Sequence, residues 1–175
     1  MAKKPTPASE TISAPSTDVR ALPPRVQEMR KAILAAVQAR DIEALRPAIE
    51  RNETLPIFAS GPQRPKTFAQ AVDFLRSRSQ DKKGAEILHV LEAIFAQPYV
   101  KSLRGQSVTY VWPAFTLTQE GPATSQELNA EELSQQWSCV LFFSLSRNLD
   151  KPPAVQRIGI GADGTWHYFW GGMGE

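Results

Sequence analysis

The fold class is decided near the end of the chain, by the stretch Val155-Gln-Arg-Ile-Gly-Ile-Gly-Ala-Asp-Gly-Thr-Trp-His-Tyr-Phe-Trp170. Two runs rich in β-branched and aromatic residues, Val155–Ile160 and Thr165–Trp170, flank the short segment Ala162-Asp-Gly164. Such runs are typical of strands, and a three-residue connection with glycine in the left-handed position closes a β-hairpin. The stretch therefore predicts an antiparallel hairpin.

The length of that loop also predicts how the two strands pair. A three-residue loop places Gly159 opposite His167 and Arg157 opposite Phe169. Because side chains alternate along a strand, the hairpin has two faces. The face expected to pack against the helices holds Ile158, Ile160, Trp166 and Tyr168. The opposite face is expected to hold Arg157, Gly159, Gly161, Thr165, His167 and Phe169.

A candidate binding site follows from the second of these faces. Its two glycines would leave a shallow floor beside a cation, an imidazole and an aromatic ring. That mixture suits recognition of a polar or anionic group, so we predict that a ligand or partner contacts Arg157, His167 and Phe169. The competing interpretation is an ordinary half-solvated sheet face on which Phe169 covers glycine backbone.

The first half of the chain is predicted to be helical, because apolar residues recur there at helical spacing in four segments. Pro23-Pro24 starts the first segment, since proline is tolerated in a first helical turn. Pro47 is expected to shorten or kink the second. The sequence Thr67-Phe-Ala-Gln70 fits a capping box at the start of the third. The predicted helices are Pro23–Ala39, Ile42–Ile49, one that begins at Thr67, and Ala85–Ala96.

After Gly105 the sequence turns to strand-forming residues. Strands are expected at Val108–Trp112 and at Cys139–Leu145, the second of which is apolar on both faces and therefore central in its sheet. A short capped helix is expected near Asn129–Glu132. Four helices followed by strands that end in a hairpin predict an α+β fold, with the helices packed on one face of a small antiparallel sheet.

Length and composition predict one domain preceded by a tail. The chain has 175 residues, of which 42% are hydrophobic. Residues 1–22 are rich in Pro, Ser, Thr and Ala, so we predict a disordered tail ahead of a single domain over residues 23–175. No apolar run reaches the roughly 20 residues that cross a bilayer, and the sequence shows no signal-peptide core.

Several activities are argued against by the sequence. A net charge of +2 without a concentrated basic run does not favour nucleic acid as a partner. Gly159–Gly164 matches G-x-G-x-x-G, but a strand and not a helix follows it, so nucleotide binding is not expected. Cys139 lies in an apolar run and is interpreted as a buried small residue, and His89 as a helix-surface histidine. We therefore predict no catalytic residue, no metal and no cofactor.

Three segments together carry a family resemblance: Asp41-Ile-Glu-Ala-Leu45, Tyr110-Val-Trp-Pro113 and Ile158-Gly-Ile-Gly-Ala-Asp-Gly-Thr-Trp-His167. With them, most of the chain after Leu22 resembles a family of uncharacterised exported small proteins of alphaproteobacteria. Members usually carry a signal peptide, and Met1-Ala-Lys-Lys4 followed by a Pro/Ser/Thr-rich tail is expected of a mature form with a new start methionine. The resemblance implies a bacterial, periplasmic location, with a cytoplasmic one as the alternative. It implies no activity.

Two functions remain in competition. The first is a non-enzymatic binding module that contacts a partner or ligand with its sheet, as the aromatic-rich hairpin and the absence of a catalytic signature indicate. The second is a small-molecule pocket protein or enzyme with a helix-plus-curved-sheet fold of the nuclear-transport-factor kind. A deep pocket lined by His167 or Tyr110 would favour the second function.

Overall fold

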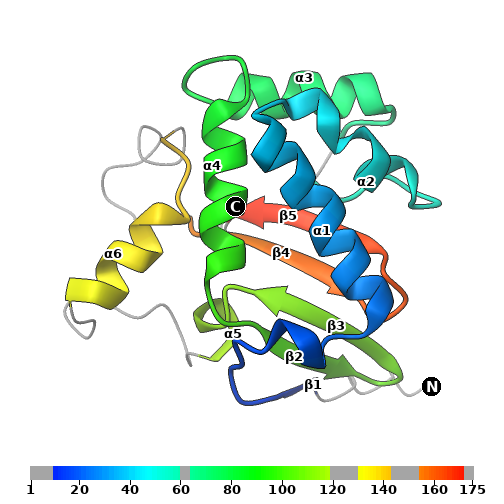
Figure 1. The fold of residues 1–175 in the computed structure, drawn as a ribbon, viewed down its shortest axis with the longest axis vertical. Helices are drawn as coiled ribbons and strands as arrows, with labels where there is room; N and C mark the ends of the chain where they lie inside the picture. Colours follow the sequence, from blue (N-terminus) through cyan, green and yellow to red (C-terminus); the bar gives the residue numbers. More distant parts are fainter. Residues whose placement is uncertain (1–9, 60–63, 119–129, 143–153, 172–175) are drawn as a thin grey trace, which may run out of the picture.

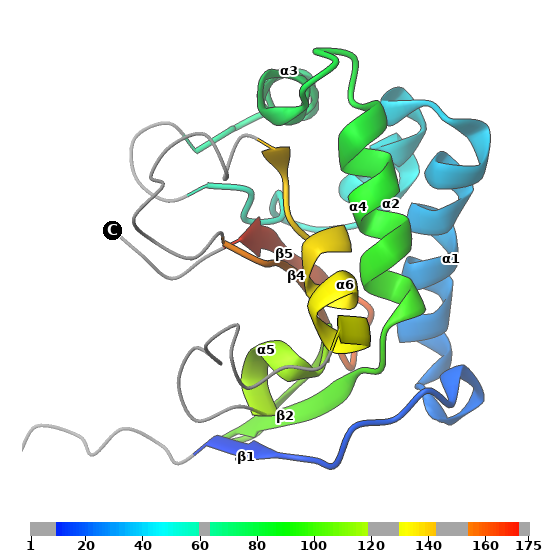
Figure 2. The same ribbon diagram turned by 90° about the vertical axis from the view of Figure 1, so that its left-hand side faces the viewer.

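The computed structural model describes residues 10–59, 64–118, 130–142 and 154–171. The described residues form a five-stranded antiparallel sheet in the order β1-β2-β3-β4-β5, in which strands that follow one another along the chain are neighbours (Figure 1). The helices α1 and α4 lie side by side across one face of this sheet (Figure 2). The strands are β1 (Glu10–Ile12), β2 (Val100–Arg104), β3 (Ser107–Trp112), β4 (Gln156–Gly161) and β5 (Trp166–Gly171).

The helices confirm most of the expected boundaries, and the fold is α+β as predicted. Pro24 begins the first helix. The second predicted helix is divided, because a 3-10 helix over Ile42–Leu45 precedes a short α-helix that contains Pro47. Thr67 caps the third helix by accepting a hydrogen bond from the Gln70 N–H. The α-helices are α1 (Pro24–Ala39), α2 (Arg46–Glu50), α3 (Phe68–Arg78), α4 (Ala85–Ala96), α5 (Phe115–Thr118) and α6 (Ala130–Ser138).

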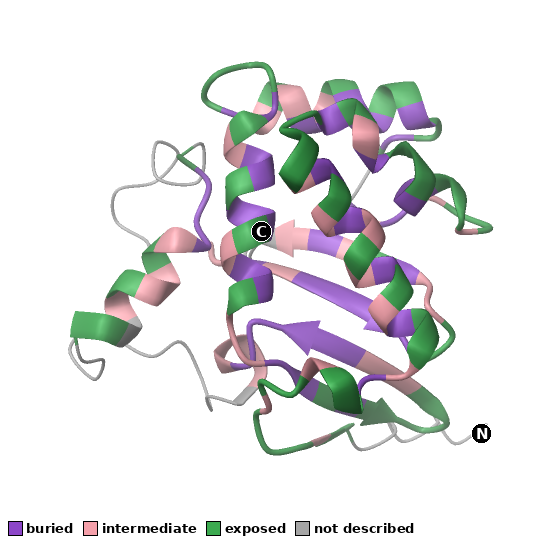
Figure 3. Cartoon of the chain, in the orientation of Figure 1, coloured by how far each residue is buried: buried purple, intermediate pink, exposed green. Residues whose placement is uncertain are grey.

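The main core lies between these helices and the inner face of the sheet, where the buried positions of Figure 3 face one another. Ile33 on α1 and Leu91 on α4 are both fully buried, which confirms the predicted helix phases. Phe95 of α4 meets Trp112 of β3 edge to face, with ring centroids 5.3 Å apart. Burial of such large side chains contributes about 1.5–3 kcal/mol each to stability. This core fixes which face of the sheet points away from the helices.

A second, smaller apolar cluster covers part of that outer face. Val100 of β2 and Val111 of β3 pack there with Ala114, and Ile12 of β1 and Leu117 of α5 lie against them. In Figure 2, α5 accordingly lies on the opposite side of the sheet from α1 and α4. Among the described residues, the strands that contribute to this cluster are β1, β2 and β3. The outer face of β4 and β5 lies beside it.

The predicted tail is partly wrong, because the chain is already ordered at Glu10. The segment from Glu10 to Ile12 pairs antiparallel with β2 as an edge strand. The backbone of Ser16 then exchanges two hydrogen bonds with Tyr99, at 2.9 and 2.8 Å, and Leu22 is buried in the main core. Low apolar content led to a prediction of disorder, but a strand at a sheet edge is held mainly through its backbone. Residues 1–9 lie outside the described residues.

The predicted strand at Cys139–Leu145 is also wrong where the structure describes it. The helix α6 runs to Ser138, well beyond the short helix that was expected, and the N–H groups of Cys139 and Val140 still bond to carbonyls of its last turn. Only Val140 forms a sheet-like contact, a single bridge to Val155. Cys139, Val140 and Leu141 are thus buried just after a helix, whereas Phe142 is exposed. An apolar run alone does not distinguish a strand from a helix. Residues 143–145 lie outside the described residues.

Candidate functional site

The turn of the predicted hairpin is confirmed. Gly164 has φ of +89°, a left-handed conformation that glycine adopts without strain. The N–H of Gly164 donates to the carbonyl of Gly161 at 2.8 Å, and the N–H of Gly161 donates to the carbonyl of Thr165 at 2.8 Å. Asp163 accepts from both the N–H and the hydroxyl of Thr165, each at 3.0 Å, which lowers the pKa of the Asp163 carboxyl. The loop therefore closes on its expected residues.

The register beyond the turn differs from the prediction, because β5 carries a bulge. Ile160 pairs with Trp166 as expected, but Gly159 pairs with Tyr168 and Ile158 with Phe169. His167 is the extra residue, and both it and Tyr168 face outward. A bulge adds one residue to a strand and so reverses the face of every residue that follows it.

Phe169 is therefore the wrong member of the predicted site. Its side chain is 3% exposed and belongs to the helix-facing core. Tyr168, which was expected in that core, takes its place on the outer face. The outer edge of β5 helps to hold this register, because Ile57 donates its N–H to the carbonyl of His167 at 2.8 Å and accepts from the N–H of Phe169 at 3.1 Å. Burial of the phenyl ring leaves the tyrosine, with its hydroxyl, on the face away from the core.

The two glycines of β4 are explained by the rings that lie on them. A Cβ atom at Gly159 would come within 2.4 Å of Tyr168 Cζ, and one at Gly161 within 2.6 Å of His167 Nε2. Both distances are shorter than any contact a real Cβ tolerates, so a larger residue would displace the ring. The expectation of an aromatic ring over glycine backbone thus holds for Tyr168 instead of Phe169. The literal G-x-G-x-x-G match is accounted for by this packing within a hairpin.

Arg157 lies beside Tyr168 on this outer face. Its guanidinium carbon is 5.9 Å from the centre of the Tyr168 ring, within the range of a cation–π contact. Burial raises the pKa of the Tyr168 hydroxyl, and the charge of Arg157 opposes that rise. Within the part of the chain that the structure describes, we find no hydrogen-bond acceptor or carboxylate partner for the Arg157 guanidinium at bonding distance. Arg157 of β4 and His167 of β5 thus lie on the same face, as predicted, but the Tyr168 ring over Gly159 lies between them, because His167 lies over Gly161.

Sequence reasoning missed a neighbouring polar cluster. Glu10 of β1 accepts a hydrogen bond from the Ser102 hydroxyl at 2.6 Å and pairs with Arg104 at 3.2 Å. The Ser102 hydrogen bond is the main cause of the lowered pKa of the Glu10 carboxyl, and Arg104 and Arg157 lower it further. Glu10 was assigned to the disordered tail, and no signal in the sequence linked it to β2. We name Arg157, His167 and Tyr168 the outer-face site, with Glu10, Ser102 and Arg104 beside it.

Chemically, the outer-face site offers hydrogen-bond donors. Its tyrosine has a raised pKa and so stays protonated at neutral pH, as a hydrogen-bond donor and not a base. Cys139 is buried and its pKa is raised to about 11, which makes it a poor nucleophile. His89 is exposed on α4. In residues 10–59, 64–118, 130–142 and 154–171, no three His, Cys, Asp or Glu side chains gather as a metal site requires.

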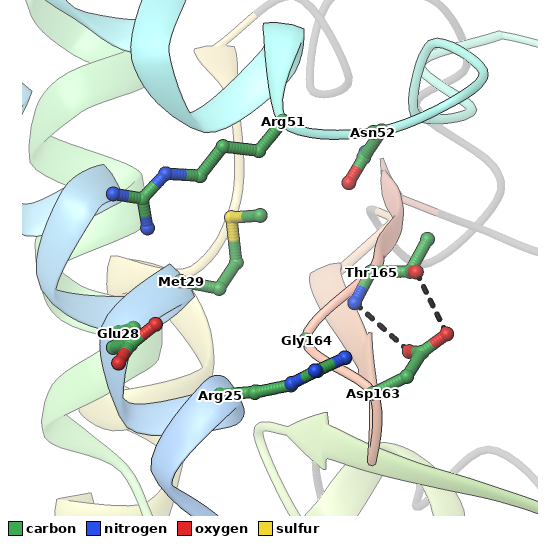
Figure 4. A pocket seen from close by; sticks show the side chains of 8 residues that line it. All are labelled: Arg25, Glu28, Met29, Arg51, Asn52, Asp163, Gly164 and Thr165. Carbon is green, nitrogen blue, oxygen red and sulfur yellow. Dashed lines mark hydrogen bonds between the residues drawn. The ribbon is translucent and has the colours of Figure 1, made fainter.

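The hollows that the structure shows lie elsewhere. One, of about 160 Å³, opens between the start of α1 and the hairpin turn (Figure 4). A larger one, of about 600 Å³, runs along the exposed side of α1. Neither is lined by His167 or Tyr110, and Tyr110 is buried in the helix–sheet core. Neither hollow therefore matches the pocket that would favour the nuclear-transport-factor-like alternative.

Comparison with known proteins adds no further assignment. A scan of protein-family models gave no match, and searches of curated proteins and of solved structures gave none either. None of the helices in the described residues combines the length and the apolar character of a membrane span. Any functional conclusion must therefore be argued from the geometry of the chain itself.

Proposed function

We propose that this chain is a non-enzymatic binding domain that holds an anionic group of a partner protein on the outer-face site. The observation that carries the proposal is the placement of Arg157, whose guanidinium lies beside the Tyr168 ring without a carboxylate partner among the described residues. Some other arginines have such partners, as Arg104 has Glu10 and Arg76 has Glu43. Among the described residues, no carboxylate pairs with the Arg157 guanidinium.

The geometry favours an oxyanion as the bound group. A guanidinium is planar and always charged, and its edge can donate two parallel hydrogen bonds to a carboxylate or phosphate. Contact with an aromatic ring restricts its rotamers, so less side-chain entropy is lost when the anion binds. The exposed His167 offers a further donor on the neighbouring strand β5. The glycines under the rings keep the floor shallow enough for a protein surface to approach.

The polar cluster beside the site supports selectivity for a single anionic group. Glu10 is already satisfied by Ser102 and Arg104, and its negative charge lies near enough to Arg157 to be stabilised by it. A partner with one well-placed carboxylate can bind Arg157 directly. A polyanion would bring further negative charge close to Glu10, which disfavours it.

We propose a periplasmic location for this activity. Its support is the resemblance carried by Asp41–Leu45, Tyr110–Pro113 and Ile158–His167, which points to an exported bacterial family. Separation of cells that express the natural gene into periplasmic and cytoplasmic fractions, with an antibody against the folded domain, tests this location. Recovery of the protein only with cytoplasmic markers would contradict it.

The binding proposal is tested by affinity capture with matched variants. The bait is the full chain, immobilised in parallel as wild type, R157Q and K101Q, and exposed to the periplasmic extract of the source bacterium. Lys101 is an exposed basic residue of β2 that pairs with Tyr110 and so belongs to the opposite face of the sheet. We expect a partner that wild type and K101Q capture equally and R157Q loses. Equal capture by all three baits, or no capture by the wild type, contradicts a protein partner at Arg157.

A further inference from the structure

A small polar hollow lies at a junction of three segments, away from the outer-face site. Figure 4 shows it between the first turns of α1, the residues that follow α2, and the hairpin turn. Its volume of about 160 Å³ is below the roughly 300–1,000 Å³ of pockets that enclose drug-sized ligands. The lining consists of Arg25, Glu28, Met29, Arg51, Asn52, Asp163, Gly164 and Thr165. A hollow of this size suits a very small molecule.

The walls of the hollow are held by partly buried contacts. Asn52 donates from its side-chain amide to the carbonyl of Trp166 at 2.8 Å and accepts from the Trp166 N–H at 3.1 Å, which ties the segment after α2 to β5. Gly164 packs directly on α1, where an added Cβ would lie 2.9 Å from the carbonyl oxygen of Arg25. Met29 is buried at the base. A rigid frame of this kind lowers the entropy cost of binding.

The charges around the hollow alternate in sign. Figure 4 shows Arg51 extending across Met29 toward α1, and Arg25 extending from α1 toward the hairpin turn. Glu28 lies on the α1 side and Asp163 on the turn. Both oxygens of Asp163 already accept hydrogen bonds from Thr165. Within the described residues, Arg25, Arg51 and Glu28 form no ion pair within 4.0 Å, although they share one hollow.

We propose that this hollow binds a small zwitterion of the α-amino-acid class. The guanidinium groups of Arg25 and Arg51, which point in different directions in Figure 4, would turn toward its carboxylate, and its ammonium group would face Glu28. Two cations and two anions leave the lining neutral, so a simple anion or cation gains little from it, whereas a molecule with both charges satisfies both kinds of side chain. This inference is independent of the proposed function, because Arg157, His167 and Tyr168 do not line the hollow.

The test is a titration of the isotope-labelled full chain, followed by amide chemical shifts. The probes are L-alanine as the zwitterion, acetate as the anion alone and methylamine as the cation alone. We expect L-alanine to shift the amides of Met29, Asn52, Gly164 and Thr165 along one saturating curve. Acetate and methylamine should bind at least about tenfold more weakly, because each lacks one charge-assisted hydrogen bond.

Variants assign the binding to the hollow. R25Q and R51Q should each weaken L-alanine at least about tenfold, and K31Q, which changes an exposed cation of α1 outside this hollow, should leave the curve unchanged. Glutamine keeps the Cβ and backbone of Arg25 that Gly164 contacts, and unchanged signals from α4 show that each variant is folded. The proposal is overturned by the absence of saturation up to about 100 mM, by acetate or methylamine binding as tightly as L-alanine, or by R51Q binding as the wild type does.

Discussion

Replacement of Phe169 and Tyr168 by alanine, one at a time, tests the bulge that defines the outer-face site. In the observed register Phe169 is 3% exposed and packs in the main core, while the Tyr168 ring lies on Gly159 at the surface. Truncation of a buried phenylalanine costs about 3–5 kcal/mol through lost burial and the cavity left behind. Loss of the partly buried Tyr168 ring should cost less, about 1–2 kcal/mol, because part of the ring stays in contact with solvent.

The assay is urea unfolding of the two variants and the wild type, at one pH and one salt concentration. Thermal unfolding is a second readout: for a chain of this length each kcal/mol corresponds to about 2–4 °C in Tm, so the smallest expected difference, about 1 kcal/mol, should separate F169A from Y168A by at least about 2 °C. The unbulged hairpin expected from the sequence reverses the order, because it buries Tyr168 and exposes Phe169. Equal losses, or a larger loss for Y168A, would refute the bulge and the placement of the site.

Three further outcomes are expected. Deletion of residues 1–17 removes β1 and the Ser16–Tyr99 bonds and should lower Tm by at least about 2 °C relative to deletion of residues 1–9 alone; equal Tm values would show that the strand contributes nothing. G164V should lower the free energy of unfolding by about 1–3 kcal/mol, because Gly164 has φ of +89° and a Cβ there would contact Arg25. An unchanged free energy of unfolding in urea would contradict the turn assignment. Asp81, whose pKa is lowered to about 2 mainly by the Ser79 hydroxyl, contributes stability above about pH 3.8 that is lost as the pH falls through about 2. The stability difference between wild type and D81N should therefore shrink over that interval, and a constant difference would contradict the assignment.

Helices were the part of the fold that the sequence predicted best. Ala85–Ala96 was expected with the boundaries that α4 has, because periodic apolar residues and a following proline are local signals. The strand β3 and the hairpin turn were found for the same reason. β1 was missed, since this edge strand is selected by backbone pairing with residues far along the chain. β2 was missed although it pairs with β3 across a short turn, because its sequence Val100-Lys-Ser-Leu-Arg104 is largely polar.

The candidate site was predicted only in part. Arg157 and His167 were placed on the correct face, because alternation holds up to the turn. The predicted faces of Phe169 and Tyr168 were interchanged, because the bulge adds one residue to β5. A single sequence carries no clear signal for a bulge. Glu10 depends on a contact with Ser102 across 92 positions of the chain, which no local pattern encodes.

The central claim is that Arg157 binds an anionic group of a partner on the outer face of the sheet. Its most direct measurement is the dissociation constant of the purified captured partner for wild type, R157Q and K101Q, at low and at physiological salt. Loss of a charge-assisted contact predicts at least about tenfold weaker binding for R157Q and no change for K101Q, with the wild-type advantage smaller at higher salt. Binding of R157Q as tight as that of the wild type at both salt concentrations would contradict the account.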